Sequence, residues 1–346
     1  MKVQGRTLPT SHGDMKKYYD EINIARGIAL LAVLIGHSFP DAFTGVNNPV
    51  AFWIHAGVYA FHMGLFFFLS GFVSGKSLCR NNVQIGSWIV KKIKRLMVPY
   101  LFYSVVTLGL KQCFSQYANN QFDMNEIWKI FVGKNPNGGM WYLWTLFVMS
   151  FFFLVLSRLG LKAGHYVLTG IFMLGLNYIL PSGFVKEIFS HVLAYSCCYS
   201  LGIWVWQNFD KVKEALERKK GSIVAEVSAA LFLLFLTVPD CPYIITWGFA
   251  TISILTFSIK VSGNKESWIY RVLGELGYYS YDIYLVSYFV QVPIRVIFYN
   301  IISAPYWLVV GMMFVLGTIV PYYVSKYVLR KVSVCNKVML GNWQKI

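Results

Sequence analysis

The chain has 346 residues, of which 56% are hydrophobic and only 13% are charged. This composition excludes an ordinary soluble domain, which needs far less apolar surface, and indicates a polytopic membrane protein. The formal net charge of +16 does not indicate a nucleic-acid partner, because the basic residues punctuate apolar stretches rather than gather on a soluble face. We interpret the charge as a signal of membrane topology.

Apolar stretches long enough to cross a bilayer, at about 20 residues each, recur along the whole chain. They lie at roughly 22–40, 50–74, 94–112, 140–158, 164–181, 187–207, 222–239, 242–260, 272–293 and 304–326. They predict an all-α integral membrane protein, a bundle of about ten transmembrane helices in one domain over residues 1–346. A re-entrant pair stays open between 222 and 260, where only PDCP separates two apolar runs.

The basic residues gather on alternate connecting segments, chiefly KKIKR at 91–95, KVKEALERKK at 211–220 and the tail after the last span. The positive-inside rule therefore predicts that both termini are cytoplasmic. The first twenty residues contain no short apolar core before a cleavage site, so we expect the first span to act as the insertion signal. The six cysteines show neither CxxC spacing nor the density of a disulfide scaffold, and no metal site is expected.

Arg26 and His37 stand eleven positions apart in the first apolar stretch, INIARGIALLAVLIGHSF. Eleven helical residues return to within about 20° of the same face and rise roughly 16 Å, so both side chains share one stripe. Arginine suits a phosphate or carboxylate, and histidine can take and return a proton near neutrality. The alternative is that Arg26 snorkels to the interface and His37 is a hydrogen-bonded interior residue.

His62 precedes MGLFFFLSGFVSG in the second stretch, where Ser70 and several glycines also favour close helix packing. A second imidazole facing the interior could orient His37 or share its proton. KKIKRLMVPY places Lys92 and Arg95 three residues apart and so on one helix face. Together they could bind the phosphates of a cytoplasmic anion. The alternative is that they only hold the loop at the membrane surface beside lipid phosphates.

Two further patterns concern the later spans. Trp141 and Tyr142 of GGMWYLW fit an aromatic belt at the membrane interface, or a surface that stacks against the sugar rings of a glycan. Asp282 lies in LGELGYYSYDIYL, and an intramembrane carboxylate needs a partner such as Arg26, a histidine or a tyrosine hydroxyl. For Asp282 we expect a structural or orienting role.

The ordered set RGIALLAVLIGH, HMGLFFFLSGF, KKIKRLMVPY, MWYLW and LGYYSYDIYL resembles the acyltransferase family 3 membrane proteins, over about residues 19 to 329. These are ten-helix enzymes that move acyl groups, usually acetyl, onto extracytoplasmic glycans. The resemblance implies that Arg26 and His37 form the family's Arg-x10-His signature, with His37 catalytic. It also implies that Lys92 and Arg95 match the Arg-x-x-Arg element associated with the acyl donor.

Three positions depart from the family pattern. Lys92 keeps the charge of the usual arginine but loses its planar fork. Asn23 stands where a carboxylate is common, three residues before the signature arginine, and Ser287 stands where a histidine often follows IYL. The last departure suggests a different handling of the acceptor.

Together with this resemblance, the sequence predicts a multi-pass O-acetyltransferase, and the resemblance implies the bacterial cytoplasmic membrane. It would take acetyl from acetyl-CoA and deliver it to a hydroxyl of a cell-surface polysaccharide or its lipid-linked precursor. His37, Arg26 and His62 are the expected catalytic residues, with His37 as general base and His62 orienting it or protonating the leaving thiolate. Arg26, Lys92 and Arg95 are expected to bind the donor, and Trp141 and Tyr142 the acceptor.

No permanently bound cofactor is expected, and the expected partners are acetyl-CoA, the glycan and membrane lipids. The formation of a homo-oligomer is left open by the sequence. Two alternatives remain. A transporter or flippase of a lipid-linked glycan would use His37, Arg26 and Asp282 as a substrate or proton path. An inactive member of the fold would serve as a membrane partner in glycan assembly.

Overall fold

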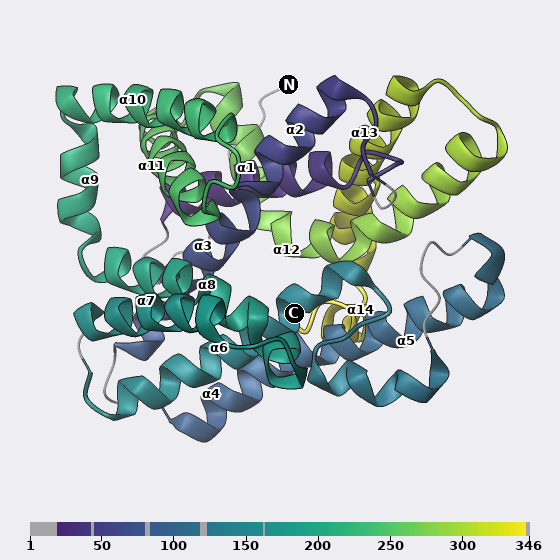
Figure 1. The fold of residues 1–346 in the computed structure, drawn as a ribbon, viewed down its shortest axis with the longest axis horizontal. Coiled ribbons are helices and arrows are strands. Elements are labelled where there is room, and N and C mark those ends of the chain that lie inside the picture. The colour runs from purple at the N-terminus through teal and green to yellow at the C-terminus, as the bar shows by residue number, and fades with distance from the viewer. Residues whose placement is uncertain (1–18, 43–44, 80–83, 118–122, 162, 344–346) are drawn as a thin grey trace, which may run out of the picture.

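The computed structural model describes residues 19–42, 45–79, 84–117, 123–161 and 163–343, so most of the polar N-terminal tail lies outside it. Every element in these ranges is helical and no described residue forms a strand, which confirms the all-α class for this part of the chain. Figure 1 shows α10, α11, α1, α2 and α13 along one long side and α7, α6, α4 and α5 along the other. Helices α3 and α12 lie between the two sides.

The longer helices coincide with the predicted apolar stretches. They are α1 (Asp20–Gly36), α2 (Pro49–Tyr59), α3 (His62–Leu78), α5 (Val98–Cys113), α6 (Trp141–Arg158), α7 (Ala163–Ile179), α8 (Phe184–Gln207), α10 (Lys219–Leu236), α11 (Tyr243–Ser262), α12 (Trp268–Ile294) and α13 (Tyr306–Val324). The shorter elements are α4 (Ile85–Lys92), η1 (Ile93–Met97), η2 (Ser115–Tyr117), η3 (Met124–Val132), η4 (Gly138–Met140), α9 (Phe209–Glu217), η5 (Arg295–Ile301), η6 (Ser325–Leu329) and α14 (Ser333–Val338).

Seven helical stretches of the described chain are long and apolar enough to cross a membrane. They are Pro49–Leu78, Ile85–Cys113, Gly138–Arg158, Phe184–Gln207, Tyr243–Ser262, Trp268–Ile301 and Tyr306–Leu329. Helices α1 and α7 have 17 residues each, and the apolar part of α10 is Gly221–Leu236, so these three fall just short of that length. The count of ten spans and the side of each terminus stay predictions.

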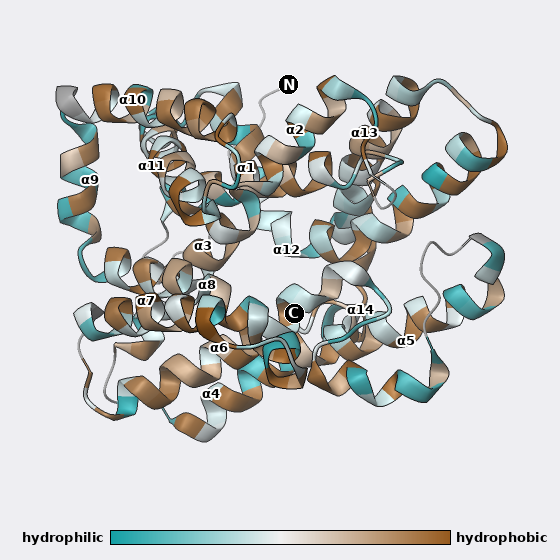
Figure 2. Cartoon of the chain, in the orientation of Figure 1, coloured by the Kyte–Doolittle hydropathy of each residue, from teal (hydrophilic) through white to brown (hydrophobic). Residues whose placement is uncertain are grey.

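The outward faces of the bundle are apolar, as a lipid-facing surface requires. Large hydrophobic side chains lie exposed on several of the long helices, for example Val105, Ile171, Phe172, Leu233 and Val315. Figure 2 shows hydrophobic residues along α10 and hydrophilic residues on α9, which joins α8 to α10. The molecule therefore presents hydrocarbon on its outer surface as well as in its core, unlike a soluble domain.

Glycines bring pairs of helices into backbone contact, because a small residue lets two helix axes approach closely. Helix α1 crosses α12 at Gly27 and Gly277, and an added Cβ at Gly277 would lie only 1.9 Å from the Asn23 carbonyl oxygen. The side-chain amide of Asn23 donates to the Gly274 carbonyl at 2.6 Å. A carboxylate, the common residue at this position in the family that the sequence resembles, cannot donate that bond.

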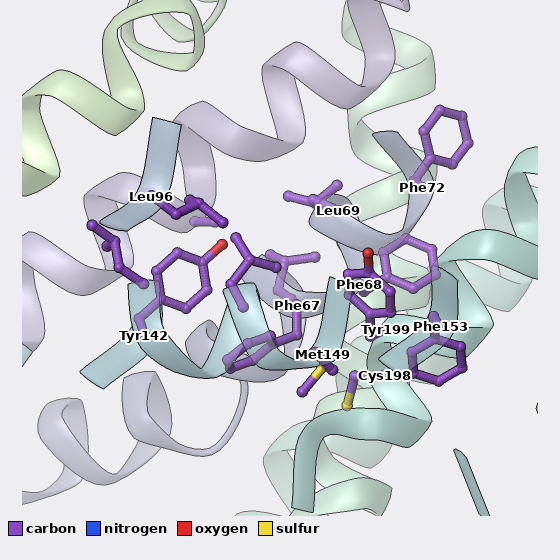
Figure 3. Close-up of a cluster of buried hydrophobic side chains, with 14 of the residues drawn as sticks. Phe67, Phe68, Leu69, Phe72, Leu96, Tyr142, Met149, Phe153, Cys198 and Tyr199 are labelled. Carbon is purple, nitrogen blue, oxygen red and sulfur yellow. The ribbon is translucent and has the colours of Figure 1, made fainter. Parts of the chain in front are cut away.

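An aromatic core joins α3, α6 and α8 (Figure 3). Phe67, Phe72 and Phe153 are all but completely buried there, and Tyr199 donates or accepts a bond with Ser150 at 3.3 Å. Gly71 of α3 sits directly against the Tyr199 backbone, so α3 and α8 touch along their main chains. This rigid contact fixes the face of α3 that points toward α1 and α12.

Candidate active site

A cavity of about 650 Å³ opens between α1, α3, α6, α12 and the segment from α4 to η1. Its volume is typical of sites for small molecules and cofactors. Four cationic side chains line it, from Arg26, Lys91, Lys92 and Arg95. None of its lining residues in the described chain is an aspartate or glutamate. An apolar-walled cavity with charges of one sign attracts and concentrates an anion.

The cavity is elongated along α3. Its lining residues on this helix extend from Ser77 to Met63, a separation of about 21 Å at the helical rise. Lys92 donates to Ser74, about one turn before Ser77, so the cations of α4 and η1 lie at the end of the bundle that contains Ser77, which we call the basic end. Toward the other end, the lining changes to aromatic and hydroxyl groups, among them Ser70, Tyr142 and Tyr284. An anionic head and a long, less polar arm would fit this gradient.

Lys92 ends α4 and points into the bundle. Its ammonium donates to the hydroxyls of Ser150 at 3.2 Å and Ser74 at 3.4 Å, and it lies 5.3 Å from the Trp88 ring centroid. None of these partners is an anion. The charge of Lys92 is therefore held in position without being neutralised, which leaves it able to attract a phosphate.

Arg95 lies in η1, a π-helical turn that interrupts the helix between α4 and α5. Its guanidinium carbon lies 3.9 Å from the Tyr281 ring centroid, and the Tyr281 hydroxyl donates to the Arg95 carbonyl at 2.5 Å. Single π turns of this kind are frequent at functional sites. The structure thus brings Arg26, Lys92 and Arg95 to one cavity, the set that the sequence predicts for the acyl donor.

The two aromatic candidates of α6 separate, because consecutive residues of a helix point in different directions. Tyr142 is buried, lines the cavity and shares a 2.8 Å hydrogen bond with Ser70. In Figure 3 its hydroxyl points toward Leu96, another residue of the cavity wall. Trp141 points elsewhere and stacks on His191, with ring centroids 4.0 Å apart. One face of the Trp141 indole is therefore already covered.

Three histidines, His37, His55 and His62, gather at the opposite end of the bundle, which we call the histidine end. Tyr59 lies at the centre of the group: its ring centroid is 4.0 Å from that of His55, 4.8 Å from His62 and 6.2 Å from His37. His37 and Tyr59 are exposed, whereas His62 is buried. Among the described residues, no three His, Cys, Asp or Glu side chains could hold a metal ion. The group is an aromatic cluster built around Tyr59.

The hydrogen bond of His62 fixes its tautomer when the ring is neutral. Nδ1 of His62 lies 2.8 Å from the Val58 carbonyl oxygen, which can only accept. Nδ1 therefore donates, and Nε2 presents a lone pair. A neutral His62 can accept a hydrogen bond from a neighbouring N–H but has no second proton to give.

His37 stands at the end of α1 rather than inside a span. Helix α1 ends at Gly36, earlier than the predicted stretch 22–40, because the residue before Pro40 disfavours helical backbone. The side-chain amide of Gln291 donates to the Leu34 carbonyl and to the Ser38 hydroxyl, both at 3.2 Å, and so braces this helix end from α12. His37 lies one turn beyond Val33, which lines the cavity.

Asp282 has different partners from those expected. Its side chain is buried and accepts from Arg330 Nε and from the Ser325 hydroxyl, each at 2.6 Å. The expected kinds were Arg26, a histidine or a tyrosine, but the cation comes from the segment after α13. This ion pair joins α12 to η6 and does not line the cavity.

Sequence reasoning missed three residues of this region. Tyr59 and His55 stand in an apolar stretch, where they look like ordinary span residues. Gln291 has no local motif, since its partners at the end of α1, Leu34 and Ser38, lie about 250 positions away. Only the spacing of His55, Tyr59 and His62 at helical intervals could have suggested a shared face.

Comparisons with known proteins identify the family of the chain. A sequence model of the acyltransferase domain family, acyltransferase family 3, matches residues 19–326. The nodulation protein NolL of Mesorhizobium japonicum is 25% identical over 140 residues, which are 39% of this chain. The chain spans about a third of the length of that relative, since the match covers 35% of it. No solved structure matches. With the family model covering nearly all of the helical bundle, the chain belongs to the acyltransferase family 3.

Proposed function

We propose that the protein is an O-acetyltransferase that moves acetyl from acetyl-CoA to a hydroxyl of a cell-surface polysaccharide or its lipid-linked precursor. The observation that carries the proposal is the elongated cavity, which Arg26, Lys92 and Arg95 line. The basic end would face the cytoplasm of a bacterial cell, as the distribution of lysines and arginines predicts.

The cavity suits acetyl-CoA in both charge and shape. The phosphates of CoA would bind at the cations of the basic end, and its long pantetheine arm would run along α3 beside Ser70 and Tyr142. Because Lys92 is held by two serine hydroxyls rather than by a carboxylate, its side chain stays available to a phosphate. The thioester would then lie toward the histidine end.

His37 would act as general base at the histidine end. It would remove the proton of the acceptor hydroxyl while the oxygen attacks the thioester carbonyl, and the carbon–sulfur bond would break to release CoA. The imidazolium of His37 would return that proton to the thiolate. A neutral His62 has only its Nε2 lone pair to offer, so orienting His37 suits it better than protonating the thiolate.

The exposed ring of Tyr59 beside His37 is a further surface for the acceptor, because aromatic faces stack against sugar rings. Tyr142 would contact the donor arm near the reacting groups. Trp141 is the weaker acceptor candidate, since His191 already covers one of its faces.

The proposal is tested by following radioactive acetyl from acetyl-CoA into glycan and lipid-linked glycan of inside-out membrane vesicles. Wild type, His37→Ala and His165→Ala are compared at equal membrane insertion. His165 is a matched control, because it lies exposed on α7, away from the cavity and from Tyr59.

We expect label in glycan with wild type and His165→Ala, and a loss of at least about 100-fold with His37→Ala, in the range of general base catalysis. Equal labelling by His37→Ala would remove His37 from the chemistry. No labelling by wild type, with acceptor shown to be present, would contradict the acetyl-CoA donor. Translocation of lipid-linked glycan without thioester consumption would instead favour the flippase.

A further inference from the structure

Residues 340–343, which we call the hook, pack against the turn that carries Arg95. They follow α14 and lie beyond residue 326, where the match to the family model ends. Leu340 is 1% exposed and belongs to the main hydrophobic core. The burial of this side chain holds the hook in place against the bundle. The carbonyl oxygen of Leu340 accepts a hydrogen bond from Arg95 Nη1 at 2.6 Å.

Gly341 makes the closest approach. Its φ of 62° lies in the left-handed region, where glycine carries no steric penalty. A Cβ added here would lie 2.3 Å from the Lys94 carbonyl oxygen and 2.8 Å from the Arg95 Cα. Both the backbone conformation and the packing therefore require glycine. Trp343 completes the contact, with its ring centroid 4.7 Å from the Lys94 ammonium.

These contacts act on a single guanidinium from two sides. The Tyr281 ring supports the flat face of Arg95, and the Leu340 carbonyl holds one Nη group. A guanidinium has five N–H donors in a rigid fork, so fixing one of them orients the others. Because Arg95 lines the cavity, the donors that remain can meet an anion there.

We propose that the hook is a positioning element of the acyl-donor site, which sets the guanidinium of Arg95 for the phosphates of the donor. This inference rests on the proposed function. The hook touches neither reacting group, so its loss should weaken donor binding and leave the chemical step intact. It makes the segment after the last long helix part of the site that α1, α3 and α12 enclose.

The test compares Gly341→Ala with Gly86→Ala, in which the new methyl group meets no atom within 4 Å. For Gly341→Ala we expect the KM for acetyl-CoA to rise about tenfold, the effect of one lost charge-assisted hydrogen bond. The kcat should stay within about twofold, as expected when only uniform binding is lost. Gly86→Ala should match wild type in both constants.

Trp343→Ala is a second, milder variant for the case in which Gly341→Ala fails to fold, and Trp343→Phe should restore its KM. Hydrogen exchange of the amides at 93–97 provides a readout that needs no donor, and Gly341→Ala or Trp343→Ala should speed it relative to Gly86→Ala. Unchanged exchange at 93–97 would overturn the hook whether or not acetyl-CoA is the donor. An active wild type whose hook variants keep a normal KM would also overturn it and leave the proposed function standing.

Discussion

Replacement of Gly277 by alanine tests how tightly α1 and α12 hold the cavity. The new Cβ would lie 1.9 Å from the Asn23 carbonyl oxygen, whereas an ordinary contact between carbon and oxygen needs about 3.3 Å. The two helices must therefore move apart by about 1.4 Å. A backbone carbonyl cannot rotate away as a side chain can, and the Asn23 bond to Gly274 resists the shift.

We expect a loss of about 3 kcal/mol in unfolding free energy, at the upper end of the usual cost of overpacking. This corresponds to a fall of roughly 5 °C in the apparent melting temperature for a chain of this size. Acetyl transfer should fall as well, because Gly277 and Arg26 both line the cavity. Gly311→Ala on α13 is the matched control, since its methyl group enters open space.

The assay is thermal unfolding of the purified protein in detergent, monitored by loss of the monodisperse peak, together with acetyl transfer in vesicles. A melting temperature for Gly277→Ala equal to that of Gly311→Ala would refute the reasoning. It would mean that the crossing of α1 and α12 is looser than the backbone contact indicates.

Three further changes probe the cavity, the histidine end and the Asp282 ion pair. Lys92→Met should raise the KM for acetyl-CoA about tenfold with little change in kcat, because it removes a cation whose hydrogen bonds go to two serine hydroxyls; a normal KM would exclude Lys92 from the donor site. Tyr59→Ala should lower kcat at least about tenfold, since its ring packs against three imidazoles, while Tyr59→Phe keeps the ring and should keep most activity; equal loss in both would point to the hydroxyl. Asp282→Asn should lower the free energy of unfolding by about 2 kcal/mol, because Arg330 loses its buried carboxylate partner. An unchanged melting temperature in thermal unfolding would show that the ion pair contributes nothing to stability.

Much of the fold could be predicted because the helices of a membrane protein follow directly from long apolar runs. The ten predicted stretches all coincide with helices, although three of these are too short to count among the seven candidate spans. The predicted stretch 22–40 extends beyond the end of α1 at Gly36. The apolar run continues to Phe39, whereas the helix has already ended before Pro40. A run of hydrophobic residues predicts which segment lies in the lipid, but it does not predict where the backbone leaves the helix.

The donor side of the site was more predictable than the histidine side. Lys92 and Arg95 are local neighbours with an obvious charge, and Arg26 is conspicuous in an apolar run. The surroundings of His37 depend on contacts between distant segments, above all Gln291 of α12, which no local pattern encodes. For the same reason the partner of Asp282 escaped prediction, because Arg330 stands 48 positions later.

The hydrogen bond between Arg95 and Leu340 also has a consequence for the order of assembly. The two residues are 245 positions apart, so a ribosome working at about 5–20 residues per second makes Leu340 roughly 12–50 s after Arg95. During that interval η1 has emerged without the segment that packs on it. The cavity therefore cannot reach its final form while the helices insert one after another, and a nascent chain is unable to hold its ligand in the native geometry until the whole bundle has been synthesised.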